Sequence, residues 1–370
     1  MPAEQQFEGS KLRLARLLNG WTKAELAERL VLSRQFVHSL ELGKAPSGDL
    51  IAALALLLKV QPSFFFSQLS TEVREEECHF RSRRSMPDKV AEQIIAHGTA
   101  FEMLVRHLDE SLSLPVVDFP HIDVSSDNDI EAAAEECRKH WKLGEGPIAN
   151  MCRTLESAGA VLTFFNTDRY EVDALGISRS RPIVVRNTAK ESPGRLRFDL
   201  AHECAHLIIH QGIDTGDEVT ESQADRFASA FLMPREPFSK EFPAMSGRLD
   251  WQAIYSMKIR WRVSARAVIR RAHVLNLLNA VQYQAANRYL SQSGQARVEH
   301  YDDRIPFETP ELIVTAVNTY LQTRNVTLAE LARRIDMTPA LIAHLAPGIL
   351  GPQTSDQPST TSVDSRFKRA

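Results

Sequence analysis

The first part of the chain carries apolar residues at helical spacing in four short runs. The run KLRLARLLNGW ends at Asn19-Gly20, a pair that stops helices. Thr22 begins the second run as a capping residue, and Glu25 three positions later completes a capping box. Ser33 can cap a third helix within VLSRQFVHSLELGK, and SGDLIAALALLLKV predicts a fourth helix that covers the others. Four short helices with a tight turn between the second and third predict a helix-turn-helix module.

The middle of the chain changes from helical to strand periodicity. Helical patterning runs through IEAAAEECRKHWKL and IANMCRTLESAG, after a charged and turn-rich connector. After Gly159, AVLTFF and PIVVRN are short runs of β-branched and aromatic residues, which predict two strands. Helical periodicity then returns and continues toward the C-terminus. The pattern therefore predicts a mainly α-helical protein with a small sheet, an α+β fold.

A segment near the C-terminus repeats the first module. TLAELARRIDMTPALIAHL, at 327–345, aligns without gaps on TKAELAERLVLSRQFVHSL, at 22–40, with seven of nineteen positions identical. The identities fall at core and cap positions, which predicts a second, degenerate helix-turn-helix module at 309–346. Its third helix begins TPALIAH and is poor in polar side chains, so binding of a partner or substrate is as compatible with it as DNA contact. Chance similarity between two amphipathic helix pairs is the alternative.

Composition and charge narrow the function classes only slightly. The 370 residues, 43% of them hydrophobic, are ordinary for a globular protein of more than one domain. A net charge of −3 gives no whole-chain attraction to nucleic acid, so DNA contact depends on a local patch. The apolar run LIAALALLL is far below the ~20 residues that span a bilayer, and no signal-peptide pattern is present, so a cytoplasmic protein without membrane contact is predicted. Four cysteines without C-x-x-C spacing predict reduced thiols: Cys78, Cys137, Cys152 and Cys204.

The segment RFDLAHECAHLIIH places two histidines four residues apart. Positions i and i+4 project from one face of an α-helix, so His202 and His206 can present two imidazoles to one metal ion. Glu203, turned by roughly 100° from His202, can act as a general base on water. In the next helical run, ESQADRFASAFLMP, Glu221 is the candidate third ligand, and Asp225 one turn later can orient a ligand imidazole. This pattern predicts a Zn²⁺ site with one coordination position left for water.

Other interpretations of this region stay open. One is a buried helix with hydrogen-bonded histidines, and another is a site that binds metal without catalysis. His210, four residues after His206, lies on the same helical face, and a hydrogen-bonded histidine of the core or rim is the favoured role. Further along, the run ARAVIRRA carries Arg266, Arg270 and Arg271, which are interpreted as solvated.

The N-terminal patterns ELAERL, S-x-x-x-V-x-x-L-E-x-G-K and L-x-V-x-P-x-x-F-F resemble the Xre/Cro-type repressor domain over about sixty residues. The resemblance implies operator DNA as a partner and a homodimer, because such operators are symmetric. It implies that Lys23 and Lys44 meet phosphates while the third helix faces base edges. The implied DNA-binding residues are Lys23, Ser33, Arg34, Gln35, His38 and Lys44. The alternative is a four-helix interaction module that has lost DNA contact.

The pattern R-x-R-F-x-x-A-H-E-x-x-H-x-x-x-H, followed by E-x-x-A-D-x-F-A-x-x-x-L-M-P, resembles the ImmA/IrrE family of zinc-dependent endopeptidases. By resemblance, His202, His206 and Glu221 are metal ligands and Glu203 is the general base. The implied substrate is a repressor or antitoxin of the Xre type, this chain's own module included, whose cleavage induces stress or phage genes. Cys204 and Ala205 depart from the leucine and glycine that are usual between the histidines.

These observations together predict a DNA-binding transcriptional regulator with a zinc endopeptidase domain. The alternative is a catalytically inactive, metal-binding regulator or scaffold that acts only through DNA and protein binding. The predicted boundaries are a helix-turn-helix domain at 1–69, a helical connector at 70–125, a zincin-like metallopeptidase domain at 126–242, a helical region at 243–308, the degenerate module at 309–346 and a disordered tail at 347–370.

Overall fold

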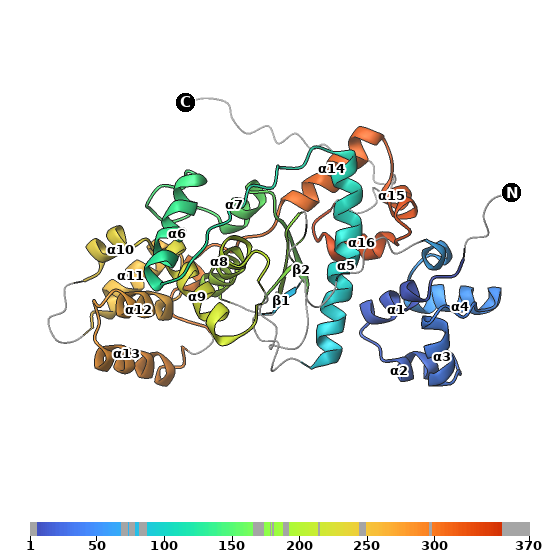
Figure 1. Ribbon diagram of the computed structural model, residues 1–370, viewed down its shortest axis with the longest axis horizontal. Helices are drawn as coiled ribbons and strands as arrows, with labels where there is room; N and C mark the ends of the chain where they lie inside the picture. The colour runs from blue at the N-terminus through green and yellow to red at the C-terminus, as the bar shows by residue number, and fades with distance from the viewer. Residues whose placement is uncertain are drawn as a thin grey trace, which may run out of the picture.

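A computed structural model gives the positions of most of the chain. It describes residues 6–67, 73, 78–80, 87–165, 174–177, 179, 181–187, 192–213, 215–243, 249–295 and 298–349. Most of the predicted tail, from residue 350 onward, lies outside the described residues. Figure 1 shows the N-terminal helices on one side of a long helix and the sheet on its other side. Within the described part of the chain, none of the helices is long and apolar enough to cross a membrane.

The N-terminal module contains four helices and a final 3-10 helix. These are α1 (Gly9–Leu18), α2 (Lys23–Arg29), α3 (Arg34–Glu41), α4 (Gly48–Leu58) and η1 (Pro62–Phe66). The capping box closes with the Glu25 N–H donating to Thr22 Oγ1 at 3.1 Å and the Thr22 N–H donating to the Glu25 carboxylate at 2.5 Å. Leu26, Val37 and Leu54 are fully buried in a core made largely by this module. The tight turn and its caps thus orient α3 outward.

Helix α5 (Asp88–Ser111) connects the N-terminal module to the rest of the molecule. At its start, Lys89 Nζ lies 3.1 Å from Glu25 and Glu92 lies 3.4 Å from Arg13 Nη2. Further along, its apolar face is buried against the sheet, with Phe101 fully buried. One helix therefore contacts the first module, through residues that include Ala96 and Met103, and also packs against the sheet.

Among the described residues, the sheet has four strands in the order β1-β3-β4-β2. The strands are β1 (Cys78–Phe80), β2 (Val161–Phe165), β3 (Ala174–Ile177) and β4 (Ile183–Asn187). β2 pairs with β4 in parallel, and the other pairs are antiparallel. Val184 packs into the core on the side of the histidine helix, while Val185 packs into the core on the side of α5. β2 and β4 are the strands that the sequence predicted, and β1 and β3 were missed.

The histidine helix lies between the sheet and a second layer of helices. Around α8 (Pro193–Ile209) lie α6 (Asp127–His140), α7 (Met151–Ser157), α9 (Glu218–Leu232) and α10 (Arg235–Glu241). Gly194 at the start of α8 lies against the backbone of Val263, where an added Cβ would come within 2.6 Å. A residue with a side chain would push α8 away from the next layer.

Helices α11 (Trp251–Trp261), α12 (Ala265–Val274) and α13 (Ala280–Gln292) complete the same core. The interpretation of the arginines of α12 as solvated is wrong for Arg271, whereas Arg266 and Arg270 are partly exposed. Arg271 is fully buried and pairs with Glu131 of α6 at 2.6 Å, while Arg270 pairs with Asp225 and Arg266 with Asn287. The carboxylate partners come from helices far away in sequence, so the local pattern could not reveal them.

The C-terminal segment has the predicted helix-turn-helix geometry. It contains α14 (Leu312–Arg324), α15 (Leu328–Arg334) and α16 (Pro339–Leu345), preceded by the short η4 (Asp302–Arg304). Thr327 and Glu330 form the same capping box as Thr22 and Glu25. The core of this segment is continuous with α5 and one face of the sheet. The repeat seen in the sequence is therefore a repeat of structure, packed in a different environment.

Candidate metal centre

The histidine and glutamate side chains of the H-E-x-x-H segment of α8 are fully buried. His202, Glu203 and His206 are each 1% exposed, because α8 is covered by the sheet on one side and by α9 on the other. A buried imidazole or carboxylate is costly without partners, so each of these groups needs an interaction that compensates for lost water.

The three predicted ligands converge. His202 Nε2 and His206 Nε2 lie 3.1 Å apart, and oxygens of Glu221 lie 3.3 Å from the first nitrogen and 3.5 Å from the second. Zinc bonds of 2.0–2.1 Å in a tetrahedron place ligand atoms roughly 3.3 Å apart. The donor set of two imidazole nitrogens and a carboxylate is also one that zinc prefers. These residues therefore fit a zinc ion, and the ligand atoms of all three lie within 4.8 Å of one another.

Each ligand imidazole has a partner on its far side. His202 Nδ1 lies 2.9 Å from Asp225 Oδ1, and Asp225 in turn accepts from Arg270 Nη1 at 2.8 Å. On the other ligand, His206 Nδ1 lies 2.9 Å from His210 Nδ1. Such contacts set which ring nitrogen carries the proton and so leave the other nitrogen for a metal.

Electrostatics favour an ionised third ligand. Burial by itself raises the pKa of Glu221, but hydrogen bonds and charge interactions with His202 and His206 outweigh it and lower the pKa to about 2. Burial lowers the pKa of His210. The cluster thus includes one carboxylate, Glu221, that is ionised near pH 7.

The two departures between the histidines face the core. Cys204 and Ala205 are fully buried among apolar side chains, and burial raises the pKa of the Cys204 thiol well above its usual value. Cys204 lies beside Cys137 of α6, and both are free thiols. These substitutions therefore alter the packing behind the site and do not enter the group of ligand atoms.

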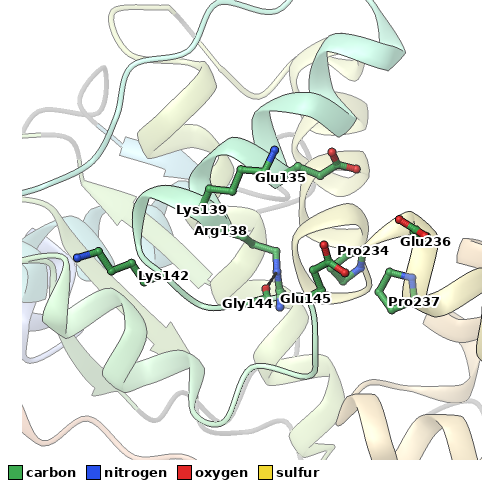
Figure 2. Close-up of a pocket in the computed structure, with 9 residues that line it drawn as sticks. All are labelled: Glu135, Arg138, Lys139, Lys142, Gly144, Glu145, Pro234, Glu236 and Pro237. Carbon is green, nitrogen blue, oxygen red and sulfur yellow. Dashed lines mark hydrogen bonds between the residues drawn. The ribbon is translucent and has the colours of Figure 1, made fainter.

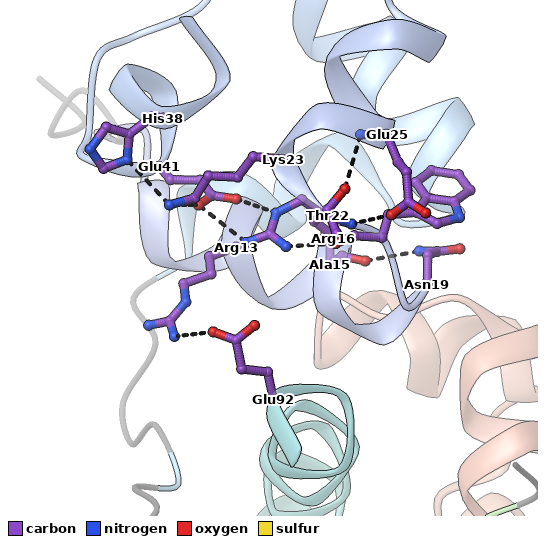
Figure 3. Close-up of polar contacts among 11 residues, drawn as sticks. Arg13, Ala15, Arg16, Asn19, Thr22, Lys23, Glu25, His38, Glu41 and Glu92 are labelled. Atoms are coloured by element: carbon purple, nitrogen blue, oxygen red, sulfur yellow. Dashed lines mark hydrogen bonds and ion pairs between the residues drawn. The ribbon is translucent and has the colours of Figure 1, made fainter. Parts of the chain in front are cut away.

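The predicted DNA-binding residues lie on one surface of the first module, around α3. Ser33, Arg34, Gln35, His38 and Lys44 are exposed, and Lys23 is half-buried. Lys23 Nζ lies 3.3 Å from His38 Nδ1 and 3.5 Å from Glu41, as Figure 3 shows.

Arg13 is not among the DNA-binding residues predicted from the sequence. This side chain lines the same hollow of about 640 Å³ as Lys23, Arg34 and His38. Glu92 at the start of α5 also lines it and points toward Arg13 (Figure 3). The only local signal was a basic residue on the outer face of the first helix, which is common on solvated helices.

A second hollow, of about 350 Å³, lies at the C-terminal end of α6 beside the start of α10 (Figure 2). Its one well-buried charge, Arg138, donates to the backbone carbonyls of Gly144, Gly146 and Phe231. Because its guanidinium N–H groups donate to these three carbonyls, Arg138 has a structural role that links these backbone segments. None of the clustered ligands lines this hollow.

Comparison with known families gives the same two parts. Residues 12–65 match the family model described as Helix-turn-helix, and residues 155–273 match a peptidase family described as the IrrE N-terminal-like domain. The predicted fusion of an Xre-type module to an ImmA/IrrE-like domain is confirmed. The peptidase match extends over α11 and nearly all of α12, which the sequence analysis had placed after the domain. No curated protein matches the chain.

Proposed function

We propose that this chain is a transcriptional regulator whose IrrE-like domain is a zinc-dependent endopeptidase acting on a repressor or antitoxin of the Xre type. The proposal depends on one observation, the convergence of His202, His206 and Glu221 at separations of 3.1 to 3.5 Å. The helix-turn-helix module supports operator DNA as the second partner, bound by a homodimer in the cytoplasm. The peptidase match supports hydrolysis of a protein.

The residues of α8 and α9 have distinct roles in this proposal. Bound zinc would supply a Lewis acid that polarises the scissile carbonyl and makes water acidic. Glu203 would take a proton from the attacking water and pass it to the leaving amine. Asp225, held by Arg270, keeps the His202 ring oriented. The ionised Glu221 supplies the negative charge that favours a dication over a monocation.

The test uses the full chain in two forms. Tagged Glu203→Gln protein serves as substrate for untagged wild type, alongside a purified Xre-type repressor as a second substrate. We expect wild type to hold about one zinc per chain, and Glu203→Gln to hold the same zinc while losing cleavage by at least about 100-fold. Glu218→Gln, an exposed glutamate at the start of α9, is the matched control and should cleave normally.

Two results would change the conclusion. Equal cleavage by Glu203→Gln and wild type would remove Glu203 from the role of base. A wild-type chain that binds no metal would favour the scaffold alternative.

A further inference from the structure

A third hollow, the junction hollow, lies where three parts of the chain meet. It has a volume of about 250 Å³ and is lined by the first module, by α5, and by α15 with the turn that follows it in the second module. None of the candidate metal ligands lines it. Besides His107, its charged or titratable lining groups are Lys11, Arg106, Glu110, Arg334 and Asp336.

Lys11 is the buried charge of the junction hollow. The residue is 1% exposed, and among the described residues its Nζ makes one hydrogen bond, to Met103 Sδ at 3.8 Å. The centroid of the Phe64 ring lies 4.6 Å from the same nitrogen. An ammonium group has three donors, and a thioether sulfur is a weak acceptor. Within the part of the chain that the structure describes, Lys11 therefore lacks the oxygen acceptors that a buried ammonium group needs.

The other buried lysine of the described chain has such acceptors. Lys258 is fully buried, and its Nζ lies 2.9 Å from Glu299 Oε2 and 2.6 Å from Asp302 Oδ1. At Lys11, burial lowers the pKa to about 8, against the attraction of Asp336. Two buried lysines of one chain are thus treated differently, and the one without carboxylate contacts borders a hollow.

The other lining charges indicate a small anion. Three basic and two acidic side chains line the junction hollow, so its net charge is +1 with His107 left aside. One small anion offsets this excess, whereas the two carboxylates repel a polyanion such as nucleic acid. The basic groups come from α1, α5 and α15, so each can donate to a different oxygen of a tetrahedral phosphate.

We infer that the junction hollow binds a small phosphate ligand, either inorganic phosphate or a phosphate monoester, with Lys11 donating to its oxygens. The site is separate from the proposed zinc site and does not depend on it. Because its lining comes from both modules and α5, an occupant would tie the first module to the rest of the molecule. Ligand binding and docking of the first module therefore stabilise each other.

The first test measures phosphate affinity. Inorganic phosphate is titrated calorimetrically into the full chain at constant ionic strength. Lys11→Met keeps the length of the side chain and removes its donors, and we expect it to weaken binding at least about tenfold. Phosphate bound at zinc or on α3 would be the same in both chains, so only the difference counts. Lys139→Met is the matched control, because this exposed lysine lines the hollow at α6, and it should bind as wild type does.

The second test separates ligand binding from packing and shows whether the variant folds. Without phosphate, Lys11→Met should unfold at a temperature at least equal to that of wild type, because a buried charge without oxygen acceptors has been removed. Phosphate should raise the midpoint of wild type more than that of Lys11→Met, since the general effect of the salt acts on both. A less stable variant with the same phosphate response as wild type would show that Lys11 only packs, and would overturn the inference.

The third test locates the ligand and names its source. Hydrogen exchange of wild type with phosphate should slow in α1 and in the turn between α15 and α16. Slowing confined to α3 or α8 would place the phosphate elsewhere and refute the site. Glycerol 3-phosphate and acetate are then titrated beside inorganic phosphate. Tighter binding of the ester supports a phosphorylated metabolite, and tighter binding of inorganic phosphate supports the free ion. Acetate binding more tightly than both would contradict the assignment of phosphate.

Discussion

The two helix-turn-helix modules of this chain share a backbone and differ in their surroundings. The turn of each passes through a left-handed residue at the same place, Val31 with φ 56° and Asp336 with φ 56°. The third helix of each is capped alike, by Ser33 Oγ accepting at 3.1 Å and Thr338 Oγ1 accepting at 3.2 Å. The same local signals have produced the same local geometry twice.

The two modules differ in the residues that make up their hydrophobic cores. Leu26 of the first module packs mainly among residues of that module. Its counterpart Leu331 belongs to a core that also contains α5 and the strand residue Val185. The first module therefore has a core largely of its own. The second module shares its core with α5 and the sheet.

Their third helices also differ in what they present. The first exposes Arg34, Gln35 and His38. The corresponding positions of the second are Pro339, Ala340 and Ala343, which offer no hydrogen-bond donors to bases or phosphates. A shared fold thus does not carry DNA recognition, because the side chains on its surface decide it.

The second module also touches the first. Gln61 Nε2 donates to the Met337 carbonyl at 3.1 Å, and Thr338 Oγ1 donates to the Lys59 carbonyl at 3.2 Å. In a DNA-binding helix-turn-helix domain this turn lies near the DNA. In the second module of this chain, the turn instead makes hydrogen bonds to the first module.

The largest expected effect comes from the buried leucines. Leu26→Ala and Leu331→Ala each remove a fully buried side chain and should cost about 2 to 5 kcal/mol. We expect Leu331→Ala to lower the unfolding midpoint of the body, and Leu26→Ala to affect mainly a separate transition of the first module. Denaturant unfolding followed by hydrogen exchange measures both. A loss confined to α14–α16 in Leu331→Ala would show that the second module is independent after all.

The next effect concerns DNA. His38→Asp places a negative charge on the exposed surface of α3 and should weaken binding of a 30-base-pair duplex by about 1 to 3 kcal/mol. Ala343→Asp makes the same change at the equivalent position of α16 and should leave binding unchanged. Fluorescence anisotropy at a fixed salt concentration measures both. Equal weakening would mean that the second module also contacts DNA.

A smaller effect is expected at the caps. Thr22→Ala and Thr327→Ala each remove a side-chain acceptor for a helix N–H and should destabilise by about 1 kcal/mol. Similar losses are expected because both boxes have the same geometry. Thermal unfolding of the two variants provides the measurement, and a loss at only one cap would contradict the equivalence.

The smallest effect is a dependence on acid. The Thr22 N–H, together with Lys89, lowers the pKa of Glu25 to about 2, and the Thr327 N–H lowers the pKa of Glu330. Because the folded pKa of Glu25 lies below its ordinary value of 4.5, its ionised form stabilises the fold fully above pH 4.5, and this is lost as the pH falls toward 2. Glu25→Gln and Glu330→Gln should each flatten the acid limb of stability against pH, Glu25→Gln more strongly because of Lys89. A steeper limb in either variant would refute the assignment.

Short segments of the sequence determine many of the helices and turns of this protein. Capping residues such as Thr22 act within one turn, and the spacing of His202 and His206 acts within one helix. Such signals specify geometry without knowledge of the rest of the chain. For this reason the helices, both helix-turn-helix turns and the group of candidate ligands on α8 and α9 could be predicted.

Other features depend on partners that are distant in sequence. The strand β3 has four residues and pairs with β1 and β4, so its own pattern carries little signal. The burial of Arg271 depends on Glu131. Only the packing of α8 against α9 placed Gln223 Oε1 2.9 Å from His210 Nε2. The sequence determined which groups could bind a metal, and the tertiary structure decided how they are held, because burial and long-range hydrogen bonds exist only once the chain has folded.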